Sequence, residues 1–285
     1  MGVIIGIDIG GSTTKIVGFA PRDGGFELLE PIIIKANDPV TSTYGAFGKF
    51  LDENGLAISD ISKIMMTGVG ASHVKNNLYG LDCQRVAEFD CIGRGGIYLS
   101  GISEGLVVSM GTGTAMVHAM KDGGMNYLGG TGVGGGTLMG LSKLLLNAEN
   151  VQHIEKYADA GSLDNIDLRI RDLTPTDSVS QLAGDLTASN FGKLSDIASK
   201  GDVALGIMNL VFETVGMVSI FAARSVGAKD IILTGNVTQL ERCRTKFDEF
   251  NRLEISDGLN FVIPDRARFA TAIGAAIIGI GGCLD

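Results

Sequence analysis

The sequence predicts an α/β protein with two similar lobes, and an internal repeat is the main reason for this prediction. Residues 3–19 (VIIGIDIGGSTTKIVGF) and 105–120 (GLVVSMGTGTAMVHAM) both show a strand, a turn of glycine and hydroxyl residues, and a second strand. Short β-branched runs also alternate with longer segments of helical periodicity, as in α/β folds. Two such lobes would each present one turn to a common cleft, whereas two unrelated hairpins are the alternative.

The composition is that of a soluble globular protein and limits the classes of partner. Of the 285 residues, 45% are hydrophobic and 19% are charged, and the net charge is -9 with a pI near 4.9. An acidic protein does not favour phosphate-rich or anionic surfaces, so we expect neither a nucleic-acid nor a membrane partner. Two apolar segments, 203–223 and 269–283, are predicted as buried core helices, because Glu213 interrupts the first and the second is too short to span a bilayer.

The cysteines and histidines predict a reduced, cytoplasmic protein without a zinc site. The cysteines are far apart and form no CxxC pair, and no histidine is spaced with one of them or with another histidine. The four cysteines are Cys83, Cys91, Cys243 and Cys283. The N-terminal stretch has no basic region before its apolar residues, so we do not expect a secretory signal.

The first turn, between two predicted strands, carries residues suited to a phosphate. Gly10 and Gly11 can adopt positive φ and let the backbone approach a bound group. The residues that follow supply hydroxyl, amide and ammonium donors: Ser12, Thr13, Thr14 and Lys15. Asp8 stands just before the turn, and a carboxylate beside a phosphate site predicts a Mg²⁺ ion between them. An ordinary glycine hairpin is the alternative.

The rest of the N-terminal half predicts further strands and helices. We expect strands at 31–35 and 61–66, a glycine turn at 67–72, and a helix at 41–53 with Thr41 as its N-cap. Glu88 and Asp90 lie where the next helix begins, a position at which the helix dipole favours carboxylates. For these two acids, capping without chemistry is the alternative to a catalytic role.

The second half begins with the repeated hairpin and continues into a glycine-rich stretch. Strands are predicted at 106–110 and 115–120, with the GTGT turn at 111–114 between them. Six of the eight residues from Gly129 to Gly136 are glycine, and they lead directly into a predicted helix. Glycines at a helix start leave N–H groups free for a nucleotide phosphate, whereas a flexible hinge is the alternative. The apolar residues of the helix fall at helical spacing: Leu138, Leu141, Leu144 and Leu145.

The remaining segments predict a helical C-terminal half. Residues 150–200 are polar and predicted to be helical, and a long apolar helix follows at 202–227. A strand at 230–234, a third glycine turn at 234–240, a helix at 238–250, a strand at 259–263 and a final helix from Arg268 complete the chain. No linker divides the sequence, so the lobes, 1–104 and 105–285, are expected to pack closely.

The three glycine and hydroxyl turns, at 8–15, 109–114 and 234–238, resemble those of the actin, sugar kinase and Hsp70 ATPase superfamily. Within it, the sequence is most similar to the type II (eukaryotic-like, Fumble domain) pantothenate kinases. The motifs of this resemblance are GIDIGGSTTK at 6–15, EFDC at 88–91, SMGTGTAM at 109–116, GGTGVGGGTLMGL at 129–141, IDLRIRD at 166–172, GDLTASNFG at 184–192 and AIGAA at 272–276. The resemblance implies a two-lobed actin-like ATPase (ribonuclease H-like) fold with a duplicated β-sheet core flanked by helices.

The resemblance also implies an activity and its participants. They are the ATP-dependent phosphorylation of the primary hydroxyl of pantothenate, with Mg²⁺, as the first step of coenzyme A biosynthesis. Further implications are a cytoplasmic homodimer, packed through helices of the C-terminal half, and contact with coenzyme A or an acyl-CoA. This reaction needs a base for the alcohol proton, and charge neutralisation by metal and backbone amides supplies most of the rate enhancement.

Site residues follow from the resemblance position by position. Glu88 takes the role of general base, and Asp8 holds Mg²⁺. The implied contacts with phosphate, nucleotide or substrate are those of Gly10, Gly11, Ser12, Thr13, Thr14, Lys15, Thr112, Gly134, Gly135, Gly136 and Thr137, and, at the adenosine end, Gly235 and Asn236.

The sequence departs from the family pattern at Tyr127. The family usually carries an arginine there, two residues before the Gly-Gly pair, where it helps to bind the acidic substrate. Either another residue such as Arg94 replaces that guanidinium, or the natural substrate is not pantothenate itself. The alternatives in function are a kinase of a related small alcohol, an actin-fold activator ATPase, and a nucleotide or acyl-CoA sensor without turnover. The spacing of Cys83 and Cys91 does not favour the iron–sulfur cluster of such an activator.

Overall fold

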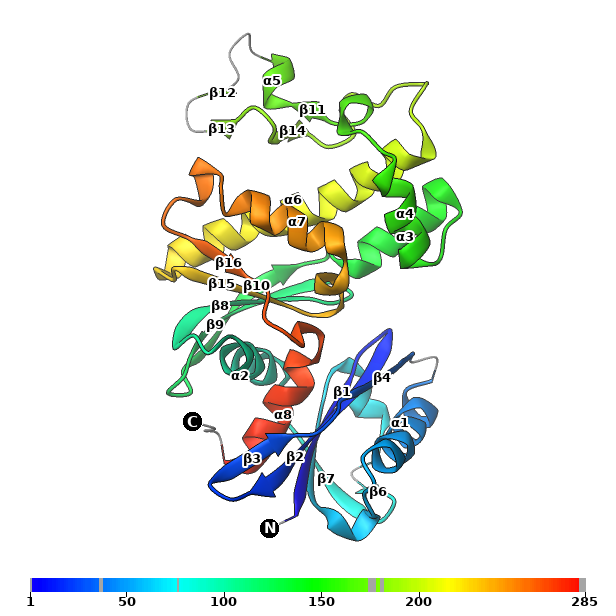
Figure 1. Ribbon diagram of the computed structural model, residues 1–285, viewed down its shortest axis with the longest axis vertical. Helices are drawn as coiled ribbons and strands as arrows, with labels where there is room; N and C mark the ends of the chain where they lie inside the picture. Colours follow the sequence, from blue (N-terminus) through cyan, green and yellow to red (C-terminus); the bar gives the residue numbers. More distant parts are fainter. Residues whose placement is uncertain (1, 36–37, 76, 174–177, 180–181, 282–285) are drawn as a thin grey trace.

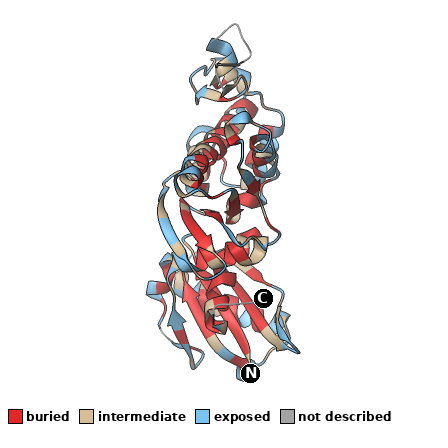
Figure 2. Ribbon diagram, turned by 90° about the vertical axis from the view of Figure 1, so that its left-hand side faces the viewer, coloured by how far each residue is buried: buried red, intermediate tan, exposed pale blue. Residues whose placement is uncertain are grey.

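The computed structural model describes residues 2–35, 38–75, 77–173, 178–179 and 182–281. Figure 1 shows an elongated molecule with one β-sheet near each of two successive levels of its long axis, and with helices beside and above them. Buried residues follow both sheets and the helices packed on them (Figure 2). Each level therefore has its own hydrophobic core.

The N-terminal sheet has seven strands in the order β3-β2-β1-β5-β7-β6, with β4 pairing β2. The neighbours β1 and β2 are antiparallel, while β1, β5 and β7 run parallel to one another. Its strands are β1 (Val3–Ile9), β2 (Thr13–Arg22), β3 (Gly25–Leu28), β4 (Ile32–Lys35), β5 (Ile61–Thr67), β6 (Asn77–Leu78) and β7 (Leu81–Arg85).

The second sheet has five strands in the order β10-β9-β8-β15-β16. Its first three strands are antiparallel neighbours, and β8, β15 and β16 run parallel. The strands are β8 (Glu104–Met110), β9 (Thr114–Met120), β10 (Met125–Thr131), β15 (Asp230–Thr234) and β16 (Asn260–Val262). The order and directions match those of β3-β2-β1-β5-β7, so the predicted duplication is confirmed.

The helices and the shorter elements complete the described chain. The α-helices are α1 (Pro39–Glu53), α2 (Glu88–Ser100), α3 (Gly135–Leu146), α4 (Val151–Asp159), α5 (Ile170–Leu173), α6 (Lys200–Val226), α7 (Glu241–Phe250) and α8 (Ala270–Ile280). The short strands are β11 (Leu168–Arg169), β12 (Ser178–Val179), β13 (Leu182–Ala183) and β14 (Thr187–Ser189). The 3-10 turns are η1 (Ile58–Asp60), η2 (Val69–His73), η3 (Leu163–Asn165), η4 (Asn236–Gln239), η5 (Glu254–Ser256) and η6 (Ala267–Phe269).

The helices α2 and α8 cross between the two sheets, where their backbones come into direct contact (Figure 1). A Cβ atom on Gly95 of α2 would lie 1.8 Å from the carbonyl oxygen of Ala270, and one on Gly274 of α8 would lie 1.9 Å from that of Cys91. Larger side chains would therefore push the helices apart. Because α8 also packs against β1 and β5, this helix, the last among the described residues, covers the N-terminal sheet.

The long apolar helix α6 is mainly buried. By length and composition α6 could cross a membrane, but 67% of its most apolar 18 residues are buried inside the protein. It packs there against α3, α4 and α7. It begins at Lys200, two residues before the predicted start, because the Ser199 side chain accepts a hydrogen bond from the Asp202 N–H and caps the helix.

Several predicted elements differ from the observed ones. Asp38, not Thr41, is the N-cap of α1, since its carboxylate accepts the Thr41 N–H at 2.6 Å and Pro39 starts the helix. Three of the eight residues of the glycine-rich stretch, Gly129 to Thr131, lie in strand β10, which pairs with β9, so the stretch is not a continuous flexible hinge. Leu144 and Leu145 are exposed on α3. Between residues 160 and 199, where a helical region was predicted, the described residues form mostly turns and two-stranded ribbons.

Candidate active site

A cleft of about 440 Å³ lies where the three glycine turns meet. It is lined by the turns between β1 and β2 and between β8 and β9, by the turn after β15, by the glycine end of β10 and by the start of α2. The sequence-predicted residues on its lining are Asp8, Gly10, Gly11, Ser12, Thr13, Lys15, Glu88, Thr112, Gly235 and Asn236. Residues from both halves of the chain thus share one cavity.

Five predicted contact residues do not line this cavity: Thr14, Gly134, Gly135, Gly136 and Thr137. The N–H groups of Gly135 and Gly136 donate to the carbonyl oxygens of Gly111 and Thr112, both at 2.8 Å. The first N–H groups of α3 are therefore occupied by the second turn, in contrast to the free donors that were predicted. These residues lie behind the turn, and their contact with a nucleotide stays a prediction.

Asp8 and Lys15 form a buried ion pair at the floor of the cleft. They are register partners on the antiparallel strands β1 and β2, so their side chains point to the same face. Lys15 Nζ lies 3.1 Å from Asp8 Oδ2, and the two side chains are 9% and 8% exposed. Gly68, with φ +89°, lies directly against Asp8, since a Cβ atom there would lie 2.7 Å from Asp8 Oδ1. Only glycine fits that backbone without displacing the carboxylate.

Glu88 is the first residue of α2, and its carboxyl group faces the same cleft. Burial raises its pKa above the ordinary value, the nearby Asp8 charge raises it further, and Lys15 opposes the change. A carboxylate whose pKa is moved towards neutrality is a stronger proton acceptor than an exposed glutamate. The cleft thus contains a group with the properties of a general base.

The third turn connects the two lobes across the cleft. Asn236 Nδ2 donates to Thr13 Oγ1 at 3.2 Å, and its Oδ1 is buried with no hydrogen-bond partner among the described residues. Gly235 has φ +94°, and a Cβ atom on it would lie 2.5 Å from the Met110 carbonyl oxygen. This close approach fixes Asn236 beside the first turn, where its unpaired oxygen can accept a hydrogen bond from a ligand.

Tyr127, at the position of the family arginine, lies on the cleft lining and stacks on Phe89. The two ring centroids are 3.8 Å apart and the planes differ by 9°. Arg94, considered from the sequence as a replacement for that arginine, is not among the lining residues, because its guanidinium lies beside Gly123 at the turn between β9 and β10. The structure thus provides an aromatic pair where a cation was expected.

Sequence reasoning did not identify Ser109, Thr131 and Thr271, which also line the cleft. Ser109 is the counterpart of Asp8 in the second sheet, since Asp8 pairs with Thr67 and Ser109 pairs with Thr234 across the equivalent parallel strands. An alignment of the two repeats would have found it. Thr271 comes from α8 and has no local sequence signal.

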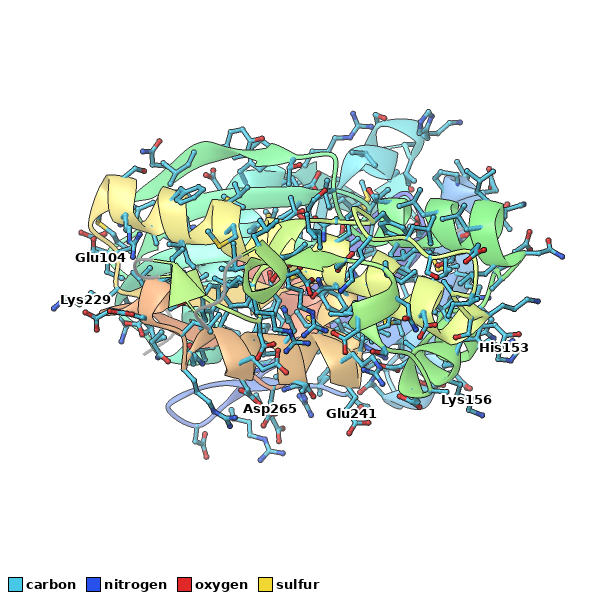
Figure 3. All side chains as sticks on the ribbon, turned by 90° about the horizontal axis from the view of Figure 1, so that it is seen from above. Glu104, His153, Lys156, Lys229, Glu241 and Asp265 are labelled. Atoms are coloured by element: carbon cyan, nitrogen blue, oxygen red, sulfur yellow. The ribbon has the colours of Figure 1, made fainter. Side chains whose placement is uncertain are left out.

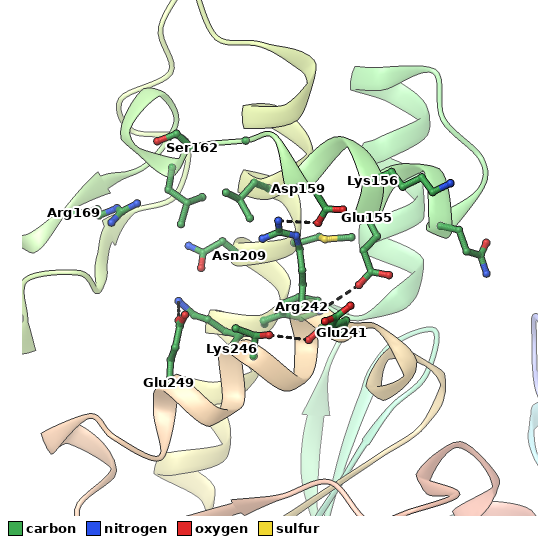
Figure 4. A pocket seen from close by; sticks show the side chains of 17 residues that line it. Glu155, Lys156, Asp159, Ser162, Arg169, Asn209, Glu241, Arg242, Lys246 and Glu249 are labelled. Carbon is green, nitrogen blue, oxygen red and sulfur yellow. Dashed lines mark hydrogen bonds and ion pairs between the residues drawn. The ribbon is translucent and has the colours of Figure 1, made fainter.

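A second cavity, of about 710 Å³, lies in the C-terminal lobe among α4, α6 and α7 (Figure 4). Two of its cations pair with acids of the same lining: Arg242 with Asp159 at 2.9 Å, and Lys246 with Glu249 at 3.9 Å. Seen from above, Lys156 and Glu241, which line it, lie at the edge of the lobe (Figure 3). None of the sequence-predicted site residues lines this cavity.

The fold belongs to the class of actin-like ATPase folds. Its β-sheet is duplicated, each copy carries a turn of glycine and hydroxyl residues, and the two turns line one shared cleft. The solved structure of the activator of 2-hydroxyisocaproyl-CoA dehydratase from Clostridium difficile, with bound ADPNP, has this fold. It matches with a TM-score of 0.70 at 19% identity, over 98% of this chain and 94% of that chain.

The family follows from the sequence comparisons. The Fumble family model matches residues 104–247, and the chain belongs to this family. A relative from Oceanobacillus iheyensis named type II pantothenate kinase is 34% identical over 185 residues, which cover 61% of this chain and 68% of the relative. A type II pantothenate kinase from Bacillus cereus (strain G9842) is 29% identical over 281 residues, or 90% of this chain and 94% of the relative.

Proposed function

We propose that the protein is a pantothenate kinase, which transfers the γ-phosphoryl group of ATP to the primary hydroxyl of pantothenate. The observation that carries this proposal is Glu88, a carboxylate of raised pKa in the same cleft as the first glycine turn. Relatives named type II pantothenate kinase support the choice of substrate. By this activity the protein catalyses the first step of coenzyme A biosynthesis in the cytoplasm.

In the proposed reaction, Glu88 accepts the hydroxyl proton as the alcohol oxygen attacks the γ-phosphorus. The new bond joins this oxygen to phosphorus, and the bond to the β-phosphate oxygen breaks to release ADP. The cleft-lining part of the first turn, Gly10–Thr13 with Lys15, and Thr112 hold the phosphates with their N–H, hydroxyl and ammonium groups. Gly235 and Asn236 contact the adenosine end, where the buried Asn236 Oδ1 suits a donor of the nucleotide.

The donor set of the cleft fits Mg²⁺. The described residues contain no group of three or more His, Cys, Asp or Glu side chains that could hold a metal by themselves. One carboxylate, that of Asp8, is sufficient for Mg²⁺, which usually takes its other ligands from substrate phosphates and water. When bound, this ion neutralises the charge that develops on the phosphate oxygens.

We further propose a homodimer and a coenzyme A ligand. Exposed apolar side chains of the C-terminal half, those of Leu144, Ile197 and Phe221, support packing of a second copy there. Light scattering after size-exclusion chromatography measures the mass directly, and a monomer at micromolar concentration would contradict the dimer. Competition of coenzyme A with ATP, measured by calorimetry, tests the proposed coenzyme A ligand.

The decisive experiment for the activity is a coupled assay of ADP release with Mg-ATP and pantothenate. We expect turnover for the wild type, and for Glu88→Gln a decrease in kcat of about 10²- to 10⁴-fold with ATP binding retained. Turnover with another alcohol only would keep the kinase class and reject the substrate. Nucleotide binding without turnover on any alcohol would instead favour a sensor.

The activator alternative has a separate test. Cys83 and Cys91 are 6% and 0% exposed, so neither thiol is accessible at the surface to ligate a cluster shared with a second subunit. Anaerobic reconstitution with iron and sulfide should therefore produce no cluster absorption.

A further inference from the structure

Helix α8 contributes one polar side chain to the cleft, that of Thr271. The other residues of this 11-residue helix are Ala, Ile and Gly. Thr271 is 8% exposed and lines the cavity, and its hydroxyl makes no hydrogen bond with any residue that the structure describes. A buried hydroxyl without a partner costs free energy, so a ligand in the cleft is the natural partner for this group.

Helix α8 runs antiparallel to β1, which brings its start to the level of Asp8. A Cβ atom on Gly6 would lie 2.0 Å from the carbonyl oxygen of Ala272, near the start of the helix. A Cβ atom on Gly279, near the end of the helix, would lie 2.8 Å from the Ile4 side chain. Because alternate residues of a strand face the same side, Asp8 points, as Gly6 does, to the face of the sheet that α8 covers. The start of α8 and the Asp8 carboxylate therefore meet at the floor of the cleft.

Helical spacing directs Thr271 towards the helix that carries the base. Thr271 shares one face of α8 with Ala275, one turn further along. Ala275 packs in a cluster with Met65 of β5 and Cys91 of α2. Glu88 lies one turn before Cys91 on α2 and lines the same cavity as Thr271. The Thr271 hydroxyl thus faces the space between the N-terminal sheet and the start of α2.

This position lies between the two groups that act in the proposed reaction, the Asp8 carboxylate with its Mg²⁺ and the Glu88 base. The transferred phosphoryl group has to lie between them, because the ion neutralises its oxygens while the base takes the proton of the attacking alcohol. The ammonium of Lys15 at the same floor is already paired with Asp8 at 3.1 Å. An unpaired hydroxyl here is a donor that remains available to a phosphoryl oxygen.

We propose that Thr271 is a further catalytic residue, whose hydroxyl donates a hydrogen bond to an oxygen of the γ-phosphoryl group of ATP. The proposal rests on the proposed kinase activity and deepens it. No bond forms or breaks at Thr271, and the hydroxyl keeps its proton throughout. Because ADP has no γ-phosphate, the contact distinguishes ATP from ADP.

The experiment removes the hydroxyl and keeps the shape of the side chain. We expect Thr271→Val to lower kcat/KM for ATP, at saturating pantothenate, by about 10- to 100-fold, and Thr271→Ser to stay within about threefold of the wild type. Calorimetric titration in the presence of Mg²⁺ measures the binding step. For Thr271→Val, Kd should rise about tenfold for a non-hydrolysable ATP analogue and change less than about twofold for ADP.

Thr43→Val is the matched control on α1. Thr43 is also a buried helical threonine, but it lies outside the cleft lining and its Oγ1 donates to the Pro39 carbonyl oxygen at 2.7 Å. Thr43→Val should therefore lower the urea midpoint and leave the ratio of the two Kd values unchanged. Thr271→Val loses no hydrogen bond within the protein, so its urea midpoint should equal or exceed that of the wild type. Thr271→Ala provides a second variant without the hydroxyl.

The outcomes separate this inference from the proposed function. An unchanged Kd ratio in Thr271→Val and Thr271→Ala overturns the inference and leaves the kinase activity intact. Equal weakening of ADP and of the analogue also overturns it, because the lost contact would then not be with the γ-phosphate. If the wild type phosphorylates no alcohol, the proposed function fails and the Kd ratio still decides on Thr271. A wild type that binds neither nucleotide overturns both.

Discussion

Replacement of Lys15 by methionine should strongly destabilise the protein, because it would leave the buried Asp8 carboxylate without its partner. At the observed separation of 3.1 Å and an effective dielectric constant near 20, the attraction between the two charges is about 5 kcal/mol. Breaking one partner of a buried pair typically costs about 3–5 kcal/mol. We therefore expect Lys15→Met to lower the free energy of unfolding by about 3–5 kcal/mol.

Urea unfolding at pH 7, followed by circular dichroism, measures this change. The double variant Asp8→Asn/Lys15→Met removes both charges and should recover more than half of the loss. The matched control is Lys49→Met, which breaks the exposed pair with Glu53 on α1, where the side chains are 54% and 45% exposed. Its effect should stay below about 0.5 kcal/mol. A loss below about 1 kcal/mol for Lys15→Met would refute the reasoning.

The single variant Asp8→Asn tests the metal role of Asp8 without an activity assay. A ligand that binds only the folded state raises stability in proportion to the logarithm of its concentration. If Asp8 contacts Mg²⁺ in the presence of ADP, then Mg²⁺ should stabilise the wild type and fail to stabilise Asp8→Asn beyond the effect of ADP alone. Equal stabilisation of both proteins would reject Asp8 as a metal ligand.

Three further predictions concern the base, the third turn and the thiols. The pKa of Glu88 is higher in the folded than in the unfolded state, so its contribution to stability is present below the unfolded pKa and is lost as pH rises through the folded pKa. The free energy of unfolding of Glu88→Gln, measured in urea, should therefore increase relative to that of the wild type between pH 4 and pH 7.5. Gly235→Ala should cost about 1–3 kcal/mol and weaken nucleotide binding in calorimetry, because its Cβ would meet the Met110 carbonyl oxygen at positive φ. Cys243, whose pKa is raised by burial to about 12, should resist iodoacetamide at pH 7.5 until the protein unfolds, as judged by mass spectrometry.

Each of these has a control in the chain. Asp90→Asn makes the same acid-to-amide change in the first turn of α2 at an exposed position, and it measures the effect of losing a carboxylate beside the helix start. Gly227 also has a positive φ, of +72°, but no atom lies within 4 Å of the position of a Cβ atom. Gly227→Ala therefore measures the loss of stability that comes from backbone strain without a steric clash. Labelling of native Cys243 at the rate of a small-molecule thiol would contradict its burial.

The sequence predicted those parts of the site that depend on local pattern. The first turn and its flanking strands are contiguous in the sequence, so the hairpin of β1 and β2 could be predicted, whereas the register that pairs Asp8 with Lys15 could not. The repeat at 105–120 predicted the second sheet for the same reason. The local pattern identified Glu88 only as an acid at a helix start. Its role as a base came from the resemblance carried by EFDC at 88–91, and its proximity to Asp8 was not visible in the sequence.

The parts that were missed depend on long-range packing. Strand β10 was hidden by its glycines, which have low strand propensity and are held there by pairing with β9. The stack of Phe89 on Tyr127 joins two segments with no local relation, and the contact of Gly135 with Gly111 uses donors that an isolated helix would leave open. Such contacts arise only once the sheets are assembled.

The contact between α2 and α8 bears on whether the two halves of the chain can fold separately. Glu88 begins α2, and α2 packs backbone against backbone on α8, a helix from the other half of the sequence. The same helix packs against β1 and β5 of the N-terminal sheet. A fragment of residues 1–104 would therefore contain the complete first glycine turn and yet lack the helix that covers its sheet and holds α2 in place, so we expect such a fragment not to fold on its own.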